Sequence, residues 1–121
     1  MTEPVVLVAH GSRADAANEA HRAACAALAE RLDRPVVAAF LELAEPSIPA
    51  GIATAAALPD ASRVLVLPLF LYPGRHVATD IPALVDEART ALPGTDVEVL
   101  EPFGADPGVL DLLAAQVRAA G

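Results

Sequence analysis

The predicted fold is decided near the start of the chain, by Val5-Val6-Leu7-Val8-Ala9-His10-Gly11-Ser12-Arg13. The first five residues of this stretch form an unbroken apolar run of strand length. Such a run is typical of a strand that is buried on both faces of a parallel sheet. A histidine and a glycine follow at once, where the strand is expected to leave the sheet. We therefore predict a strand over Val5–Ala9, with His10 just beyond its carboxyl end.

The rest of the chain repeats this alternation of short apolar strands with longer helical patterns. Further strands are expected at residues 36–41, 64–67 and 97–100, and helices at residues 15–32, 46–58, 81–92 and 107–119. Asp80 and Asp106 are the expected N-caps of the last two helices. The alternation predicts an α/β fold: one three-layer domain over residues 1–121, with four parallel strands in the order 2-1-3-4.

The first helical pattern is rich in alanine, and its buried stripe is predicted to be Ala20, Ala24, Ala27, Leu28 and Leu32. On the same segment His21 is expected to be a partly exposed helix residue with no functional role. Cys25 is the only cysteine, so no intramolecular disulfide can form. We expect Cys25 to be a small buried thiol.

Composition excludes several kinds of partner. The formal net charge is −8, and all eight cationic side chains are arginines. Nucleic acids and anionic membranes both require a broad basic surface, so neither is expected as a partner. The longest apolar stretch, residues 64–72, is about half of a membrane span. Without a basic leader at the start, the chain is predicted to be cytoplasmic.

Chemically active side chains follow the predicted strands at one edge of the sheet. His10 follows the first strand, Glu42 the second, and His76 the third. Right-handed crossovers bring the carboxyl ends of parallel strands to one edge, and ligands bind where the winding reverses. The opposite edge receives ordinary turn residues. We therefore predict a site that joins His10, His76 and Glu42.

Two imidazoles and a carboxylate suit divalent Co, Ni, Fe or Zn, with coordination positions left open for a ligand. Imidazole also titrates near neutrality, so His10 and His76 could accept protons from a substrate. Arg13 and Arg75 each lie beside one of these histidines. In an acidic protein this placement suggests an anionic ligand, such as a polycarboxylate.

Some neighbouring residues have two readings. Glu45 is an alternative to Glu42 as the functional acid, and Ser12 either caps a helix or binds a substrate carboxylate. Phe70 and Tyr72 either line an apolar wall for a flat ligand or pack into the core.

Four motifs in this order resemble the short class II chelatases, the CbiX-type family of sirohydrochlorin cobaltochelatases and ferrochelatases. The motifs are residues 7–13, residues 40–43 with 46–48, residues 68–82, and residues 102–104. The resemblance covers nearly the whole chain. It implies an α/β domain that corresponds to one half of a longer, two-domain chelatase.

The resemblance also implies a function: insertion of a divalent metal into sirohydrochlorin without ATP or any other nucleotide, in the biosynthesis of cobalamin or sirohaem. Co²⁺ is the first candidate for the metal, followed by Fe²⁺ and Ni²⁺. The family's metal-contacting histidines correspond to His10 and His76, and its acid to Glu42. The resemblance implies a homodimer, because longer relatives join two such halves around a cleft.

Two other functions stay open. The first is a tetrapyrrole or metal carrier that keeps the fold without turnover. The second is a phosphoesterase that uses His10 together with Arg13 and Arg75. The sequence lacks a glycine-rich phosphate loop and a clear nucleophile, and this weakens the hydrolase hypothesis.

Overall fold

The computed structural model describes residues 3–121, apart from the side chain of His76. It contains a four-stranded parallel sheet with the order β2-β1-β3-β4, which confirms the predicted fold class and strand order. The strands are β1 (Val5–Ala9), β2 (Val36–Phe40), β3 (Arg63–Pro68) and β4 (Asp96–Val99). Val5 is paired in register with Val36 on one side and with Leu65 on the other. All four carboxyl ends therefore lie at the same edge.

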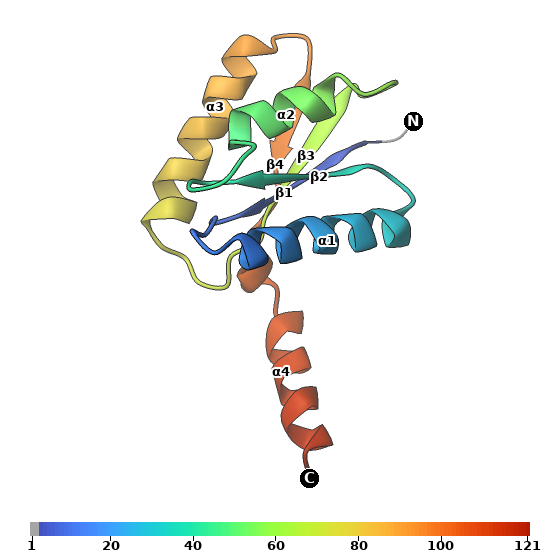
Figure 1. Cartoon of the computed structure of the whole chain (residues 1–121), viewed down its shortest axis with the longest axis vertical. Coiled ribbons are helices and arrows are strands. Elements are labelled where there is room, and N and C mark those ends of the chain that lie inside the picture. The colour runs from blue at the N-terminus through green and yellow to red at the C-terminus, as the bar shows by residue number, and fades with distance from the viewer. Residues whose placement is uncertain (1–2) are drawn as a thin grey trace.

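Helices cover the two faces of β1 and β2. The longer helices are α1 (Asp15–Leu32), α2 (Ile48–Ala56), α3 (Ile81–Ala91) and α4 (Gly108–Ala119). Two short turns of helix, η1 (His76–Asp80) and η2 (Phe103–Ala105), precede α3 and α4. Figure 1 shows α1 on one side of β1 and β2, and α2 on the other. Over the described residues, none of the helices has the length and apolar character needed to span a bilayer.

The main core is aliphatic and lies between the sheet and the α2–α3 layer. It is formed by Val6, Val8, Ala39, Ile48, Ile52, Ala55, Val64, Val66, Ile81, Val85, Ala88 and Val97. In β1 the two residues that point to the other face, Val5 and Leu7, are buried as well. Burial on both faces explains why this strand is an unbroken apolar run rather than an alternating one.

The buried face of α1 differs from the prediction. The residues that turn toward the sheet are Asn18, His21 and Cys25, and the prediction of Ala20, Ala24 and Leu32 was wrong because these three are exposed. His21 is only 7% exposed, so its predicted exposure was wrong too. Its Nε2 lies 2.9 Å from the carbonyl oxygen of Leu7 in β1. A helix with alanine on every side has no strong apolar stripe, so polar contacts select the face that it buries.

Cys25 is a buried thiol, as predicted. It is 3% exposed, and its Sγ lies 3.8 Å from Nε2 of His21. Burial raises the pKa of Cys25 to about 11, because the thiolate would lose its hydration. The thiol therefore stays protonated and unreactive near neutral pH.

The starts of α2 and α3 correct two details of the prediction. α2 begins at Ile48 instead of residue 46, with Ser47 as N-cap: its Oγ accepts a hydrogen bond from the Ala50 main-chain nitrogen at 3.3 Å. Asp80 occupies the predicted N-cap position of α3, but its side chain makes no capping hydrogen bond and its backbone is already helical, continuing from η1. Helical bonding starts earlier, where the main-chain nitrogen of Ala78 donates to Gly74 at 2.9 Å.

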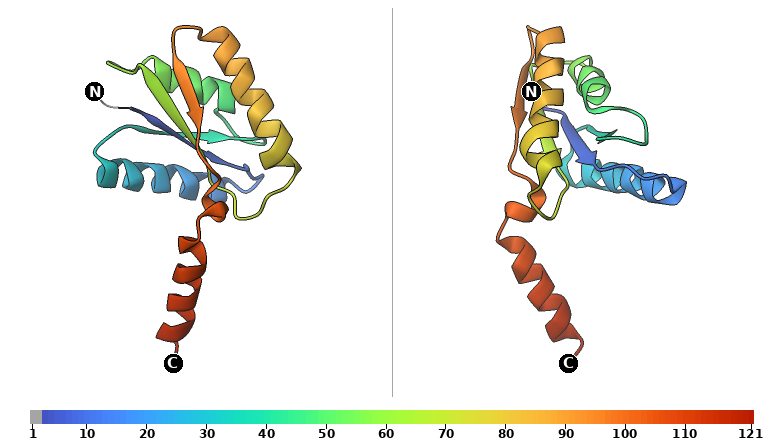
Figure 2. Two further views of the ribbon diagram at one scale, coloured as in Figure 1. Left: turned by 180° about the vertical axis from the view of Figure 1, so that it is seen from behind. Right: turned by 90° about the vertical axis from the view of Figure 1, so that its left-hand side faces the viewer.

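The last helix lies apart from the sheet. α4 begins at Gly108 with Pro107 at its N-cap position, so Asp106 lies one residue before the cap instead of occupying it as predicted. Oδ1 of Asp106 accepts a hydrogen bond from the Gly108 nitrogen at 2.7 Å and closes the turn that enters the helix. Figures 1 and 2 show α4 projecting from the carboxyl edge of the sheet, away from the other helices. The sheet is thus covered by α1, α2 and α3, while α4 covers neither face of it.

Candidate functional site

The chain segments that follow β1 and β2 stay paired beyond the ends of the strands. The main-chain nitrogen of Leu41 donates to Ala9 at 2.9 Å, and that of Glu42 donates to His10 at 3.1 Å. These two hydrogen bonds continue the ladder of the sheet to its carboxyl edge. They place His10 and Glu42 side by side, as the order of the strands predicted.

Gly11 makes this close approach possible. Its φ is 96°, in the left-handed region that favours glycine. A Cβ added at this position would lie 1.7 Å from the carbonyl oxygen of Glu42, far inside van der Waals contact. The glycine after His10 is therefore required by the packing of the two loops.

The His10 imidazole has a defined orientation. Its Nδ1 lies 3.0 Å from the carbonyl oxygen of Gly11. A carbonyl oxygen only accepts hydrogen bonds, so this contact puts the ring proton of a neutral His10 on Nδ1 and leaves the lone pair on Nε2. Nε2 in turn lies 3.3 Å from Oε2 of Glu42, and both side chains are about half exposed, at 45% and 50%.

This pair of atoms is arranged to share a cation. A lone pair on nitrogen and a carboxylate oxygen repel each other at this distance unless a proton or a metal ion lies between them. Two ligand atoms bound at about 2.1 Å in tetrahedral geometry are about 3.4 Å apart, close to the separation of Nε2 and Oε2. A metal-binding histidine also commonly donates its other ring N–H to a main-chain carbonyl, as His10 does to Gly11.

Asn18 holds the loop that carries His10, a role that the sequence analysis missed. It is 6% exposed. Its Oδ1 accepts from the main-chain nitrogen of Ser12 at 3.0 Å, and its Nδ2 donates to the Ser12 carbonyl at 2.8 Å. The only available signal was its spacing of three and seven residues from His21 and Cys25, which places all three on one helical face.

Ser12 stabilises the turn that enters α1. Its Oγ accepts a hydrogen bond from the main-chain nitrogen of Ala14 at 3.0 Å. Ala14 occupies the N-cap position of α1, so Ser12 closes the turn before the helix rather than capping it directly.

Phe70 and Tyr72 lie on the segment that follows β3. Phe70 is half-buried and packs against the core, and its ring meets that of His10 in an edge-on contact with centroids 6.5 Å apart. Tyr72 is 81% exposed, so it is not a core residue. Both residues line a hollow of about 230 Å³ that Glu101 and Pro102 help to enclose. The positions of Phe70 and Tyr72 suit the predicted apolar wall for a flat ligand.

Other predicted residues lie around this edge. Arg13 and Arg75 are exposed, on the segments after β1 and β3. His76 begins η1, and its side chain lies outside the described part of the structure. Glu45 is exposed, and its carbonyl oxygen accepts from Nη2 of Arg22 at 2.9 Å. Glu42 is the carboxylate that lies beside His10.

Asp80 is a further acid near Glu42 that the sequence pattern assigned to capping. The two side chains line a hollow of about 300 Å³, together with Leu41, Ala83 and Leu84. Among the side chains that the structure describes, no three of His, Cys, Asp and Glu come together as a metal site. The described part of the site is the His10–Glu42 pair, and Asp80 lines a hollow together with Glu42.

Comparison with known proteins gives the family. The CbiX family model matches residues 4–120, so the chain belongs to the CbiX family. The chloroplastic sirohydrochlorin ferrochelatase of Arabidopsis thaliana is 34% identical over 94% of this chain and 51% of its own length. The sirohydrochlorin cobaltochelatase of Methanothermobacter thermautotrophicus is 30% identical over 96% of this chain and 91% of its own length. The chain thus spans about half the length of the plant relative.

Comparison with solved structures supports the assignment of the chain to the CbiX family. The CbiX protein of Marinobacter aquaeolei VT8 superposes with a TM-score of 0.82 at 27% identity, over 98% of this chain and 96% of the other. SirB from Bacillus subtilis, solved with Fe³⁺, superposes with a TM-score of 0.85 at 27% identity. That match covers all of this chain and 48% of SirB. The resemblance found in the sequence is therefore confirmed at the level of family and fold.

Proposed function

We propose that this protein inserts a divalent metal ion into sirohydrochlorin without a nucleotide. The observation that carries the proposal is the His10–Glu42 pair, in which Nε2 of the imidazole lies 3.3 Å from a carboxylate oxygen. The names of the relatives as sirohydrochlorin ferrochelatases and cobaltochelatases support the choice of substrate.

In the proposed reaction the metal ion arrives as a substrate on Nε2 of His10, with His76 as a second nitrogen ligand. Glu42 offsets the positive charge of the metal ion. Two pyrrole N–H groups must lose their protons as the macrocycle takes up the metal, and His10 and His76 accept them. Atoms and charge balance, because one divalent cation replaces two protons.

The surrounding residues hold the macrocycle. Arg13 and Arg75 bind peripheral carboxylates through paired N–H donors, and Ser12 adds a hydroxyl group at the same edge. The rings of Phe70 and Tyr72 form the apolar wall against its flat face. Beside these rings one copy of the chain offers hollows of about 230 and 420 Å³, and we propose that a second copy completes the cleft as a homodimer.

Co²⁺ is the first candidate for the metal and Fe²⁺ the second, with Ni²⁺ as a further option that the same ligands accept. Structures of SirB with cobalt and with Fe³⁺ support the first two. The product then enters cobalamin or sirohaem biosynthesis. We place the reaction in the cytoplasm, where a lone thiol such as Cys25 is stable.

The test is direct. Purified protein mixed with sirohydrochlorin and Co²⁺, Fe²⁺ or Ni²⁺ in separate anaerobic reactions should change the absorption spectrum faster than the protein-free control. No acceleration with any of the three metals contradicts the proposal. Tight binding of sirohydrochlorin without acceleration identifies the protein as a non-catalytic carrier instead.

A further inference from the structure

Arg22 connects α1 to the loop that carries Glu42. Its Nη2 donates a hydrogen bond to the main-chain carbonyl oxygen of Glu45 at 2.9 Å. Its Nη1 pairs with the side chain of Glu19 on α1. The guanidinium carbon lies 5.1 Å from the centroid of the Phe40 ring, within the range of a cation–π contact. Three contacts therefore hold the Arg22 side chain, and its bond to Glu45 attaches the loop to the helix.

The loop of residues 41–45 leaves β2 and returns to it. Its base is closed by the main-chain nitrogen of Phe40, which donates to the carbonyl oxygen of Pro46 at 2.9 Å. Within the loop Leu43 has a φ of 67°, in the left-handed region that is costly for a leucine. Such a conformation persists only where neighbouring contacts hold it in place. The hydrogen bond from Arg22 to the loop is one such contact.

The same helix also holds the loop that carries His10. The Asn18 side chain binds the main chain of Ser12 through two hydrogen bonds. Asn18 and Arg22 are four residues apart, so they are neighbours on one face of α1. Both loops are therefore attached to a single helical turn. This shared attachment limits how far His10 and Glu42 can move apart.

The limit matters most before a metal ion arrives. Metal binding requires an unprotonated Nε2 on His10 and an ionised carboxylate on Glu42. In those states the two groups repel each other until a cation lies between them. A scaffold that keeps them 3.3 Å apart supplies the ligand separation in advance. Pre-organisation of this kind strengthens binding, because less freedom is lost when the ion binds.

We infer that Arg22 is a positioning residue for metal capture: it holds the Glu42 loop so that the carboxylate stays within reach of a metal ion on His10. The inference rests on the proposed function in taking a divalent metal ion as the ligand of this pair. Arg22 acts through Glu42 and does not contact the ion. A direct electrostatic effect of Arg22 would have the opposite sign, because one cation disfavours the binding of another nearby.

Calorimetric titration with Co²⁺ alone, without sirohydrochlorin, tests the inference. Arg22→Met keeps an apolar stem beside Phe40 and removes the hydrogen-bond donors. We expect Co²⁺ binding to weaken about fivefold, a size typical of residues that act through a shared contact. Arg31→Met is the matched control, because it removes the same charge from the last turn of α1. It should change the affinity by less than about twofold, since exposed charges at that distance are screened by salt.

A double-variant cycle separates positioning from a general loss of structure. In the Glu42→Gln background the carboxylate that Arg22 positions is no longer charged. Arg22→Met should then change the Co²⁺ affinity by less than about twofold. A general disturbance of the fold around His10 would instead weaken binding equally in both backgrounds.

Amide hydrogen exchange of the metal-free protein gives a second readout. The Glu42 main-chain nitrogen donates to His10 at the carboxyl edge, and that of Val5 donates to Pro35 at the other edge. In Arg22→Met the Glu42 amide should exchange about fivefold faster or more, because the loop opens locally, while the Val5 amide should be unchanged.

Four results overturn the inference: tighter Co²⁺ binding by Arg22→Met, unchanged binding, equal weakening with Glu42 and with Gln at position 42, or no Co²⁺ binding by the unmodified protein. Equal acceleration of exchange at both amides also contradicts it, because the whole fold would then be loosened. If the coupling is present but metal insertion into sirohydrochlorin is not accelerated, the inference stands and only the proposed function fails.

Discussion

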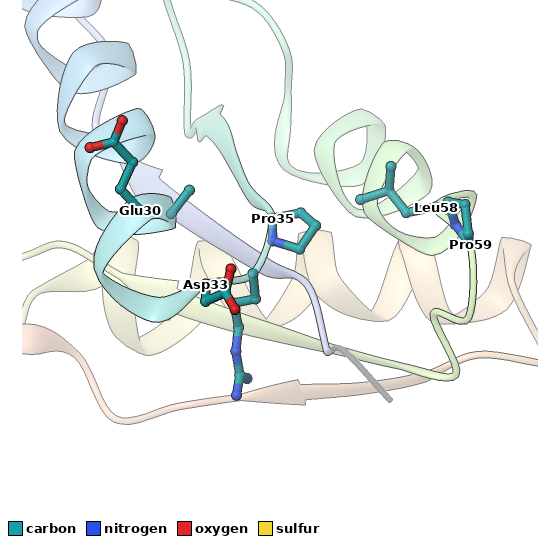
Figure 3. A pocket seen from close by; sticks show the side chains of 7 residues that line it. Glu30, Asp33, Pro35, Leu58 and Pro59 are labelled. Carbon is teal, nitrogen blue, oxygen red and sulfur yellow. The ribbon is translucent and has the colours of Figure 1, made fainter.

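The two edges of the sheet differ in what they do with their polar residues. At the amino edge a hollow of about 510 Å³ lies between the end of α1 and the end of α2. Figure 3 shows Glu30, Asp33 and Pro35 on one side of it and Leu58 and Pro59 on the other. Asp33 ends α1 in a left-handed conformation, and Arg34 binds the main-chain carbonyl of Glu3. Ending a helix and binding a nearby main-chain carbonyl are structural roles that are typical of turn residues.

At the carboxyl edge the two hollows beside Tyr72 are smaller, about 230 and 420 Å³. Their neighbourhood, however, contains the His10–Glu42 pair, in which a ring lone pair and a carboxylate converge. The contrast teaches that the volume of a hollow does not identify a site in this fold. A functional site is identified instead by side chains that converge on one point and require a cation between them.

The largest effect on the rate of metal insertion is expected when the imidazole of His10 is removed. His10→Ala removes the proposed metal ligand and proton acceptor, and we expect the rate of metal insertion to fall about 1,000-fold, within the range usual for a positioned acid or base. Glu30→Ala, on the amino edge, should leave the rate unchanged. The measurement is the initial change in absorbance of sirohydrochlorin with Co²⁺. Equal rates for the two variants would refute the assignment of the site to the carboxyl edge.

The second-largest effect on the rate of metal insertion is expected at Gly11, which follows His10. Gly11→Ala forces a Cβ against the Glu42 carbonyl and a positive φ on alanine, so the two loops must separate. We expect insertion to slow about 100-fold, as for a misplacement of about 1 Å, and stability to fall by about 1–3 kcal/mol. Gly94→Ala is the matched control at the amino edge, because nothing lies within 4 Å of its added Cβ. Denaturant unfolding and the insertion assay compare the pair.

Glu42→Gln keeps the shape of the side chain and removes its charge. We expect insertion to slow about 10-fold, and Co²⁺ binding to weaken by a similar factor, because the metal then lacks a partner that offsets its charge. Glu45→Gln is the neighbouring control and should change both by less than twofold. Calorimetric titration with Co²⁺ alone separates metal binding from turnover. If Glu45→Gln has the larger effect, the functional acid has been misassigned.

The smallest effect on rate is expected at Asn18. Asn18→Ala breaks both hydrogen bonds to Ser12 and leaves partly buried main-chain groups without these partners, so the free energy of unfolding should fall by about 1–2 kcal/mol. Insertion should slow only a few-fold, because the His10 loop keeps its pairing with Glu42. Thr90→Ala, which removes an exposed bond to the Asp86 carbonyl, should cost less than about 0.5 kcal/mol. Similar losses for both variants would mean that Asn18 does not hold the loop.

Strand and helix periodicity predicted much of this molecule. β1 and α1 have the predicted bounds, and the strand order agrees with the prediction. The pairing of His10 with Glu42 follows from the same reasoning, because residues after adjacent parallel strands must meet. These features depend on local patterns and on the handedness of crossovers, both of which can be read from one sequence.

Other features depend on contacts between distant residues. His21 was expected to be partly exposed, but it is buried against Leu7, fourteen residues away. Asp80 has the composition of an N-cap, yet η1 continues into α3 through it. Neither outcome follows from propensity, because each is set by what the rest of the fold places nearby.

The sequence by itself determined the parallel α/β sheet, the edge at which its reactive residues gather, and the family to which the chain belongs. It could do so because apolar periodicity and strand direction are local properties. Only the tertiary structure decided which face α1 buries, which proton the His10 ring keeps, and where α4 points. Those outcomes depend on hydrogen bonds and close contacts between segments that are far apart in the chain, such as Asn18 with Ser12 and Gly104 with Phe70.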